Sequence, residues 1–303
     1  MKRIIIVLLL IIMYLLFNVI TLKEEEYLDN SAKINDNEVE ISMKNSRYDF
    51  GVFLDVKYTQ RNIDYISKYS EIIIDVRQAD FNTIESIRDE NTKIYSYLSF
   101  GSLETFREYY NEFENLCIMD YEGFDDECFI DVRDSSWQDY LLNDELKKIN
   151  EYEIDGIFFD NFDVYHHFND SDFLDAINNF LIRFKLLYPD LEVFVNGGYK
   201  YFSDCIDSKC NSLNTISKVN IEEVYSRIKS YKKEEFVINK EKDVRYVLEY
   251  MDLLIENNFD LYVIEYVNDN EIYVNNSDTY LSREIKLYMC DSINLTVDCT
   301  VFD

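Results

Sequence analysis

The sequence predicts an α/β protein built on a (β/α)8 TIM barrel, and three observations lead to that prediction. Eight short runs rich in β-branched and aromatic residues recur along the 303-residue chain, and several are apolar at consecutive positions, as strands buried on both faces are. Amphipathic helical patterns lie between these runs. About 255 residues remain after an N-terminal segment, which suits one such barrel. A doubly wound parallel sheet is the alternative, because a strand count made from sequence can be wrong by one or two.

The predicted strands share a short length and a composition typical of buried sheet. In chain order they are residues 50–54, 72–76, 93–99, 129–132, 156–159, 192–196, 216–224 and 261–266. Residues 294–302 are a further candidate strand.

The segments between the strands predict helices, since their apolar residues recur at every third and fourth position. One such stripe runs from Phe173 to Leu187, with Ser171 as the expected N-cap and Pro189 just beyond the end. Similar stripes cover residues 137–149 and 244–255. We interpret these stripes as core packing and not as cofactor sites.

The first 22 residues predict a transmembrane signal-anchor. Lys2 and Arg3 precede an almost unbroken apolar run from Ile4 to Leu22. As a helix this run would reach roughly 28 Å, about the thickness of a hydrocarbon core. No small-residue cleavage site follows it, and the positive end is expected to stay inside. A cleaved signal peptide is the alternative.

The domain organisation follows from this segment. Residues 1–22 are the predicted anchor, residues 23–46 are polar and aperiodic and predict a short stalk, and residues 47–303 form the barrel domain. We therefore expect a single-pass protein of the cell membrane with its main domain outside, or a secreted protein if the signal is cleaved.

Composition excludes several classes of function. The chain has 60 acidic and 30 basic residues, a formal net charge of −30, and so acidic a surface repels nucleic acid. Two histidines exclude a histidine-rich metal centre, so no metal is expected. No phosphate-binding glycine loop is present, and no cofactor is expected.

All six cysteines lie in the predicted exported part of the chain, where disulfides are plausible. The simplest pairing joins neighbours in sequence, namely Cys117 with Cys128, Cys205 with Cys210 and Cys290 with Cys299. Reduced, buried cysteines are the main alternative. A zinc site is a weaker one, because the sequence has no CxxC pair.

Polar residues gather at the carboxyl ends of the predicted strands, where a barrel carries its active site. Carboxylates and amides bind sugar hydroxyls and aromatic rings stack on sugar rings, so this set predicts a sugar-binding cleft, although solvated acidic strand ends are the alternative for any one position. The candidate substrate-binding residues are Asp75, Tyr97, Asp131, Arg133, Asn161, Asp163, Tyr165, Asn196, Glu265 and Tyr266.

Two carboxylates are candidate catalytic residues, since glycoside hydrolysis needs an acid and a nucleophile or base on either side of one bond. Asp160 follows the apolar strand 156–159 and should emerge at the cleft floor, where burial raises a carboxyl pKa. Glu222 lies on the predicted strand 216–224, which is two strands further around the barrel than the strand before Asp160. In an extended segment Glu223 would point to the opposite face.

Five segments resemble, in order, the motifs of the family 114 glycoside hydrolases. Residues 154–165 (IDGIFFDNFDVY) carry the most specific match. The sequence departs from the family pattern at Phe124-Asp125-Asp126, where the family has Trp-Pro-Gly, and at Phe129, which replaces a Trp; these changes touch the expected cleft wall and therefore the sugar specificity. The other matching segments are 93–107 (KIYSYLSFGSLETFR), 123–133 (GFDDECFIDVR), 193–198 (VFVNGG) and 219–225 (VNIEEVY).

The resemblance implies a TIM barrel with endo-α-1,4-polygalactosaminidase-type activity, and it places the family's catalytic Asp on Asp160 and its catalytic Glu on Glu222. The implied partner is a cationic amino-sugar polysaccharide, which an acidic cleft would attract. Two alternatives stay open at this point. One is a non-catalytic carbohydrate-binding surface barrel, and the other is a hydrolase of a mixed galactosamine and glucosamine exopolysaccharide.

Overall fold

The computed structural model describes residues 48–88, 92–121, 123–168, 170–268 and 271–297. The predicted anchor (residues 1–22) and stalk (residues 23–46) lie outside the described residues, so both stay predictions. Within the described ranges, no helix has the length and apolar character needed to cross a membrane.

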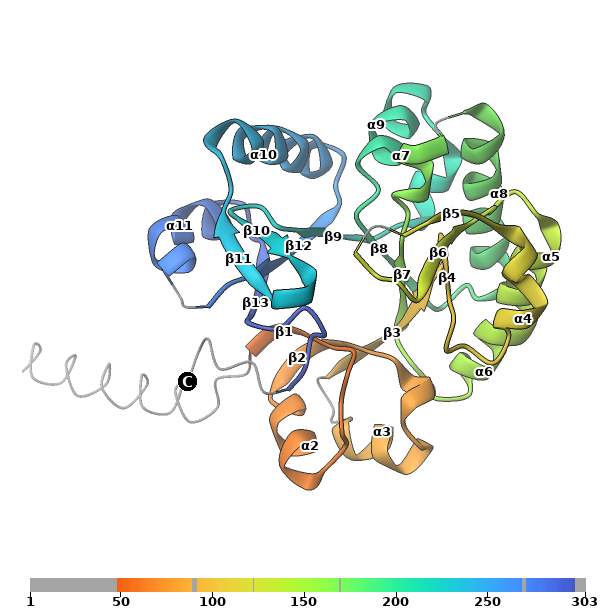
Figure 1. The fold of residues 1–303 in the computed structure, drawn as a ribbon, viewed down its shortest axis with the longest axis horizontal. Coiled ribbons are helices and arrows are strands. Elements are labelled where there is room, and N and C mark those ends of the chain that lie inside the picture. Colours follow the sequence, from red (N-terminus) through yellow and green to blue (C-terminus); the bar gives the residue numbers. More distant parts are fainter. Residues whose placement is uncertain (1–47, 89–91, 122, 169, 269–270, 298–303) are drawn as a thin grey trace, which may run out of the picture. The chain divides into compact units, whose positions relative to one another are not determined.

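Eight parallel strands form a nearly closed barrel surrounded by helices, which confirms the predicted (β/α)8 architecture (Figure 1). Each strand pairs in parallel with its neighbour in the order β1-β2-β3-β7-β8-β9-β12-β13. The strands are β1 Tyr48–Phe53, β2 Tyr69–Ile74, β3 Lys93–Ser99, β7 Gly156–Asp160, β8 Glu192–Asn196, β9 Lys218–Glu222, β12 Asp260–Tyr266 and β13 Lys286–Cys290.

The barrel strands are apolar on both faces because helices cover the outside and side chains fill the inside. In β7, Ile157, Phe158 and Phe159 are all buried, although they point alternately inward and outward. A Cβ on Gly156 would lie 2.5 Å from the carbonyl oxygen of Glu192 on β8, so this strand begins with a residue that has no side chain.

Aromatic packing joins the two ends of the sheet. The Tyr288 ring on β13 lies 6.3 Å from the ring of Phe50 and 5.7 Å from that of Phe53, both on β1. Beyond these strands the Leu54 N–H donates to the carbonyl oxygen of Leu295 at 3.0 Å. These contacts bring the last strand beside the first and complete the wall of the barrel.

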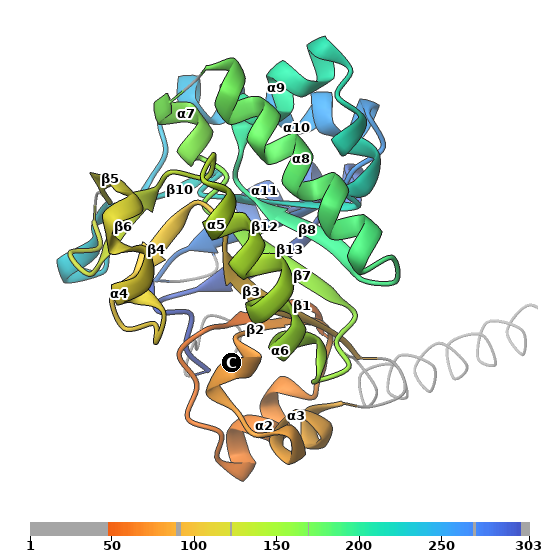
Figure 2. The same cartoon turned by 90° about the vertical axis from the view of Figure 1, so that its right-hand side faces the viewer.

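Helices link successive strands and cover the outside of the barrel (Figures 1 and 2). The predicted stripe from Phe173 to Leu187 lies in the long helix α8, whose N-cap is Asp170 and not Ser171, because the Asp170 carboxylate accepts from the Phe173 N–H at 2.9 Å. The helices are α2 Gln60–Ile66, α3 Phe81–Ile87, α4 Tyr110–Phe113, α5 Ser135–Tyr140, α6 Leu146–Asn150, α7 Val164–Phe168, α8 Ser171–Leu187, α9 Tyr199–Ser208, α10 Glu241–Glu256 and α11 Glu271–Ser282.

The predicted fourth strand, residues 129–132, is not part of the barrel. It overlaps β6 (Glu127–Ile130), which pairs in antiparallel fashion with β4 (Ser102–Glu104) and β5 (Cys117–Asp120) in a separate small sheet. This sheet belongs to an insertion between β3 and β7, which pair directly with each other. A short apolar run looks the same in sequence whether it joins the barrel or an insertion, and for that reason the prediction was wrong here.

The eighth barrel strand is instead β13, a run that the sequence analysis passed over. The candidate strand at residues 294–302 is not supported where it can be assessed, since residues 294–297 form turns and coil, and the remainder lies outside the described residues. The other seven predicted runs are barrel strands within a few residues of the expected bounds.

A second antiparallel hairpin, β10 (Ser226–Ser230) and β11 (Glu235–Ile238), follows β9. Its tip contains the short 3-10 turn Tyr231–Lys233. Like the β4-β5-β6 sheet, this hairpin rises from the carboxyl end of the barrel, where it contributes to the site described below (Figure 2).

The cysteines follow the predicted pairing in part. Cys117 and Cys128 form a disulfide that joins β5 to β6. Cys205 and Cys210 are free thiols, so that predicted pair is wrong in this structure; both sulfurs instead contact the side chain of Asn178, at 3.3 Å and 3.4 Å. Cys290 is disulfide-bonded, and residue 299 lies outside the described residues.

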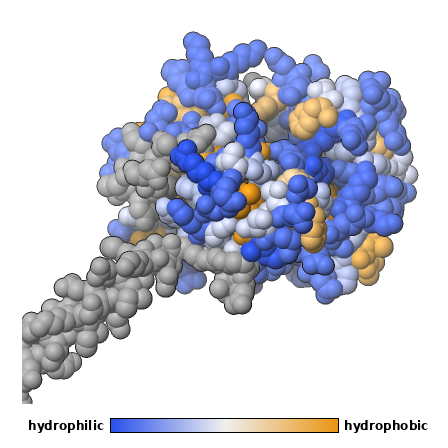
Figure 3. Space-filling view, turned by 90° about the horizontal axis from the view of Figure 1, so that it is seen from below, coloured by the Kyte–Doolittle hydropathy of each residue, from blue (hydrophilic) through white to orange (hydrophobic). Residues whose placement is uncertain are grey.

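The surface agrees with the acidic composition. The face shown in Figure 3 is mostly hydrophilic, and its apolar residues lie in separate small patches. Dispersed apolar residues of this kind are normal on the surface of a globular protein.

Candidate active site

A cleft of about 700 Å³ opens at the carboxyl ends of the barrel strands. This is the end at which TIM barrels carry their active sites. Of the twelve predicted site residues, eight line the cleft, and they come from the ends of six strands or from the turns that follow them. These eight are Asp75, Tyr97, Asp160, Asn161, Asp163, Asn196, Glu222 and Tyr266.

The centre of the cleft floor holds the two candidate catalytic carboxyl groups, joined by one amide. Asn196, at the end of β8, lies between Asp160 at the end of β7 and Glu222 at the end of β9. Its Nδ2 donates to Oδ1 of Asp160 and to Oε1 of Glu222, each at 2.8 Å. The two carboxylate oxygens are therefore separated by at most twice that distance.

Each carboxyl group has a further donor. The Tyr266 hydroxyl on β12 donates to Oε2 of Glu222 at 2.9 Å. The backbone N–H of Asn161 donates to Oδ1 of Asp160 at 2.7 Å. Asn161 has a left-handed backbone with φ of 65°, a conformation that ends the strand and turns its own side chain toward the small sheet.

Burial raises the pKa values of both groups, and the charge of Asp160 adds to the rise at Glu222. Burial is the largest cause for Glu222, the charge of Asp160 adds to it, and donors from Asn196 and Tyr266 only partly offset them, so the pKa of Glu222 rises to about 7. Burial also raises the pKa of Asp160, against hydrogen bonds from Asn196, Asn161 and Tyr97. A site with one carboxyl group protonated near neutral pH suits acid and base chemistry.

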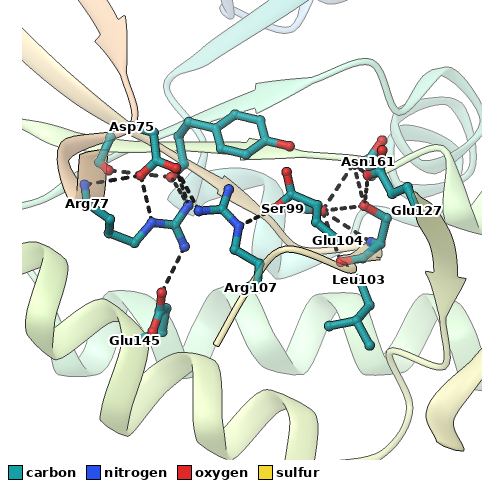
Figure 4. Close-up of polar contacts among 12 residues, drawn as sticks. Asp75, Arg77, Ser99, Leu103, Glu104, Arg107, Glu127, Glu145 and Asn161 are labelled. Carbon is teal, nitrogen blue, oxygen red and sulfur yellow. Dashed lines mark hydrogen bonds and ion pairs between the residues drawn. The ribbon is translucent and has the colours of Figure 1, made fainter. Parts of the chain in front are cut away.

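One wall of the cleft is a hydrogen-bonded cluster around Asn161 (Figure 4). Asn161 Nδ2 donates to the Ser102 hydroxyl at 2.8 Å, to the Ser99 hydroxyl at 3.1 Å and to Oε1 of Glu127 at 3.2 Å. The Tyr121 hydroxyl donates to Asn161 Oδ1 at 2.9 Å. This cluster connects the turn after β7 to the inserted sheet.

Glu127 is a cleft residue that sequence reasoning missed. Burial raises its pKa to about 8, with added repulsion from Glu104 and Asp160, although the Ser102 hydroxyl donates to it. Glu127 lies within the motif at residues 123–133 but before the predicted strand 129–132, so its position at a strand end does not select it. The glutamate between Gly123 and Asp131 was the signal that could have found it.

A charge cluster around Asp75 lies next to this wall of the cleft (Figure 4). The Asp75 carboxylate accepts hydrogen bonds from Nε of Arg77 at 2.6 Å and from Nη1 of Arg107 at 2.7 Å. These two cations outweigh the effect of burial and hold the pKa of Asp75 below its usual range. Arg107 also donates to Glu104 at 2.5 Å, and Arg77 to Glu145 at 2.8 Å. Asp75 is thus ionised and firmly oriented.

Asp163 lies beside the turn that follows β8. Its Oδ1 accepts from the Gly198 N–H at 3.1 Å, and burial raises its pKa to about 6. A Cβ on Gly197, whose φ is 66°, would lie 2.3 Å from the same carboxylate. The glycine pair therefore permits the close approach of this carboxylate to the backbone.

Four predicted site residues lie outside the cleft lining. Asp131 and Arg133 follow β6, which is not a barrel strand, and they pair with each other at 2.8 Å on the outer surface. Tyr165 is buried and donates to Asp204 at 2.8 Å. Glu265 is fully buried and accepts from the Tyr280 hydroxyl and from Ser226, so it anchors the segment after β9.

Glu223 lies in the cleft, which corrects the expectation that it would face the other way. Alternation holds only while a chain stays extended, and Glu223 has a left-handed backbone with φ of 62° just after β9 ends. Its carboxylate accepts from the Ile228 N–H in the β10–β11 hairpin.

The hairpin meets the small sheet across the mouth of the cleft. The ring of Tyr231 lies 5.3 Å from that of Phe124, and Lys232 lies 3.3 Å from Asp125. Phe124, Asp126 and Tyr231 all line the cleft. Two segments distant in sequence therefore form one wall with aromatic rings available for stacking on sugars.

The cleft is strongly acidic. Nine carboxylate residues line it against two arginines, Arg107 and Arg227, and Arg107 is already paired. Among the described residues, no group of histidine, cysteine and acidic side chains could hold a metal ion. The arrangement can protonate a leaving oxygen, supply an anionic nucleophile or base, and attract a cation.

Comparisons with known proteins agree with this fold. The model of glycoside-hydrolase family GH114 matches residues 31–187. Among solved structures, the glycoside hydrolase domain of PelA from Pseudomonas aeruginosa shares 12% identity at a TM-score of 0.69, covering 84% of this chain and 98% of that one. Ega3 from Aspergillus fumigatus, in complex with galactosamine, shares 16% identity at a TM-score of 0.59, covering 83% and 93%. A comparison with curated proteins finds no match.

Proposed function

The protein belongs to glycoside-hydrolase family GH114 and is a glycosidase, and we propose that it cleaves internal linkages of an amino-sugar polysaccharide. This is the activity of an endo-α-1,4-polygalactosaminidase. The observation that carries the proposal is the pair of carboxyl groups, Asp160 and Glu222, bridged by Asn196 at the floor of the cleft.

The two groups have different roles in this proposal. Glu222 holds a proton near neutral pH and acts as the general acid. Asp160 attacks the anomeric carbon as the glycosidic C–O bond breaks, and Glu222 gives its proton to the leaving oxygen. Glu222 then takes a proton from water, which attacks the glycosyl–Asp160 ester and frees the carboxylate.

The short separation supports retention of configuration. Retaining glycosidases hold their carboxyl groups about 5–5.5 Å apart, whereas inverting enzymes need about 6.5–9.5 Å to admit a water molecule. A single amide nitrogen at 2.8 Å from both groups favours the shorter spacing.

A cationic polymer fits the charge of the cleft. Free amines of a partly deacetylated polymer are protonated, and the ionised carboxylates among the nine acidic residues of the cleft would attract them. Ega3, which shares the fold, was solved with galactosamine. A mixed galactosamine and glucosamine polymer has the same charge and is a second candidate substrate.

We also propose that the protein is exported. The apolar run from Ile4 to Leu22 supports anchoring in the membrane with the barrel outside, where a polysaccharide would be met.

The direct test is to incubate the protein with partly deacetylated α-1,4-galactosamine polymer and count new reducing ends. Asp160→Asn should abolish cleavage and Glu222→Gln should reduce it about 10²–10⁴-fold, whereas Asp131→Asn, which changes a carboxylate outside the cleft, should leave it intact. Binding without cleavage by the folded wild-type protein would support the non-catalytic carbohydrate-binding alternative. Cleavage of the mixed polymer alone would identify that substrate instead.

A further inference from the structure

Beneath Asn196 lies a residue with no role so far, Asn220 on β9. The strand register places Asn220 directly opposite Asn196 of β8, with their side chains next to each other. Asn220 Nδ2 donates to Asn196 Oδ1 at 2.7 Å. Asn220 is fully buried and does not line the cleft, so it does not touch substrate.

The orientation of the Asn196 amide matters because its two ends have opposite polarity. As it lies, its NH2 group faces Oδ1 of Asp160 and Oε1 of Glu222. A rotation by half a turn would aim its carbonyl oxygen at both carboxyl groups and repel their ionised forms. Something must therefore hold the carbonyl end away from the cleft.

Asn220 supplies that restraint, although one of its own polar atoms is buried without a partner. Its own Oδ1 is buried and has no hydrogen-bond partner among the described residues. A buried acceptor without a partner is unfavourable, and native structures rarely contain one without a compensating reason. The compensating reason here is the donor that Asn220 presents to Asn196.

We propose that Asn220 is a positioning residue that fixes the Asn196 amide so that one NH2 group serves both carboxyl groups. The inference rests on the proposed function for its catalytic meaning. It follows that the chain of amides from Asn220 through Asn196 sets the proton affinity of the Asp160–Glu222 pair, because donors to a carboxylate favour its ionised form.

Two variants test this. Asn220→Leu keeps the shape of the side chain and removes both its donor and its unpaired acceptor, while Asn220→Asp keeps the shape and, in its ionised form, turns the donor into an acceptor facing Asn196. The titration of the Asp160 and Glu222 carboxyl carbons is followed by NMR in the full chain without substrate, together with the melting temperature and the pH profile of kcat.

We expect both carboxyl groups to titrate at higher pH in Asn220→Asp, with a smaller shift in the same direction in Asn220→Leu. We expect kcat on polymer to fall on the order of tenfold, since misplaced catalytic groups lose rate steeply. The melting temperature of Asn220→Leu should change little, because the unpaired acceptor of Asn220 is gone but Asn196 Oδ1 loses its donor.

The matched control is Asn178→Leu. Asn178 is a half-buried asparagine whose Oδ1 accepts from the hydroxyls of Tyr201 and Ser212, away from the cleft. It should lose thermal stability without any change in the titration. The proposal would be overturned if both variants fold and their Asp160 and Glu222 carboxyl groups titrate as in the wild type. It would also be overturned if the variants lose thermal stability without any change in this titration. Because the titration needs no substrate, an inactive wild-type protein would refute the proposed function and leave this test intact.

Discussion

The loss of activity at alkaline pH should follow the deprotonation of Glu222. Removing the Tyr266 hydroxyl should shift this alkaline limb of the pH profile. Tyr266 donates to Oε2 of Glu222 at 2.9 Å in a buried setting, which favours the ionised carboxylate and lowers its pKa. Tyr266→Phe removes the donor and nothing else. The pKa of Glu222 should therefore rise, and the acid should stay protonated to higher pH.

The magnitude can be worked out from these contacts. With its pKa at about 7, Glu222 is about half protonated at pH 7, against about 0.3% for a carboxyl with its ordinary pKa of 4.5. A hydrogen bond to a charged group contributes about 1.5–3 kcal/mol, and 1.36 kcal/mol corresponds to one pKa unit. Tyr266→Phe should thus shift the alkaline limb upward by about one unit or more.

The assay is the pH dependence of kcat for polymer cleavage, counted as new reducing ends. Tyr165→Phe is the matched control, since the Tyr165 hydroxyl bonds to Asp204 outside the cleft and its loss should leave the limb in place. An alkaline limb that stays fixed or moves to lower pH in Tyr266→Phe would refute the assignment of Glu222 as the acid.

Three further predictions follow from the same structure. Glu222→Gln should lose about 10²–10⁴-fold on polymer but much less on a substrate with an activated aryl leaving group, which needs no proton, as steady-state kinetics would show. Gly101→Ala places a Cβ 1.9 Å from the Asn161 carbonyl oxygen and should lower the free energy of unfolding by about 1–3 kcal/mol or more, measured by denaturant titration; an unchanged midpoint would contradict the contact. Replacing Cys117 and Cys128 by serine should cost about 3 kcal/mol of stability in the same measurement, and no loss would show that the disulfide does not constrain the unfolded chain.

The barrel was predictable because its signal is local. A strand such as β7 is apolar at consecutive positions, and the stripe from Phe173 to Leu187 repeats at helical spacing, so each segment carries its own pattern. The failures came where the pattern does not say which sheet a strand joins. β6 has the composition of a barrel strand but pairs with β4 and β5, and that choice depends on partners far along the chain.

The site divides in the same way. Asp160, Asn196 and Glu222 were predicted because the end of a parallel strand faces the cleft by construction. Asp131 and Arg133 were predicted wrongly as cleft residues, because the strand that precedes them belongs to the small antiparallel sheet and not to the barrel. The prediction for Glu265 was wrong for another reason. Its buried carboxylate accepts hydrogen bonds from Tyr225, Ser226 and Tyr280 and does not line the cleft.

The sequence by itself determined the fold class, because hydrophobic periodicity is a property of neighbouring residues, and it determined the family through the motifs that resemble those of the family 114 glycoside hydrolases. It also predicted that Asp160 and Glu222 lie at strand ends. Only the tertiary structure decided how these groups meet: the amide of Asn196 between them, Asn220 beneath it, and Glu127 brought to the wall by an inserted sheet. Distances, burial and the resulting pKa values depend on contacts between segments far apart along the chain, and such contacts exist only once the chain has folded.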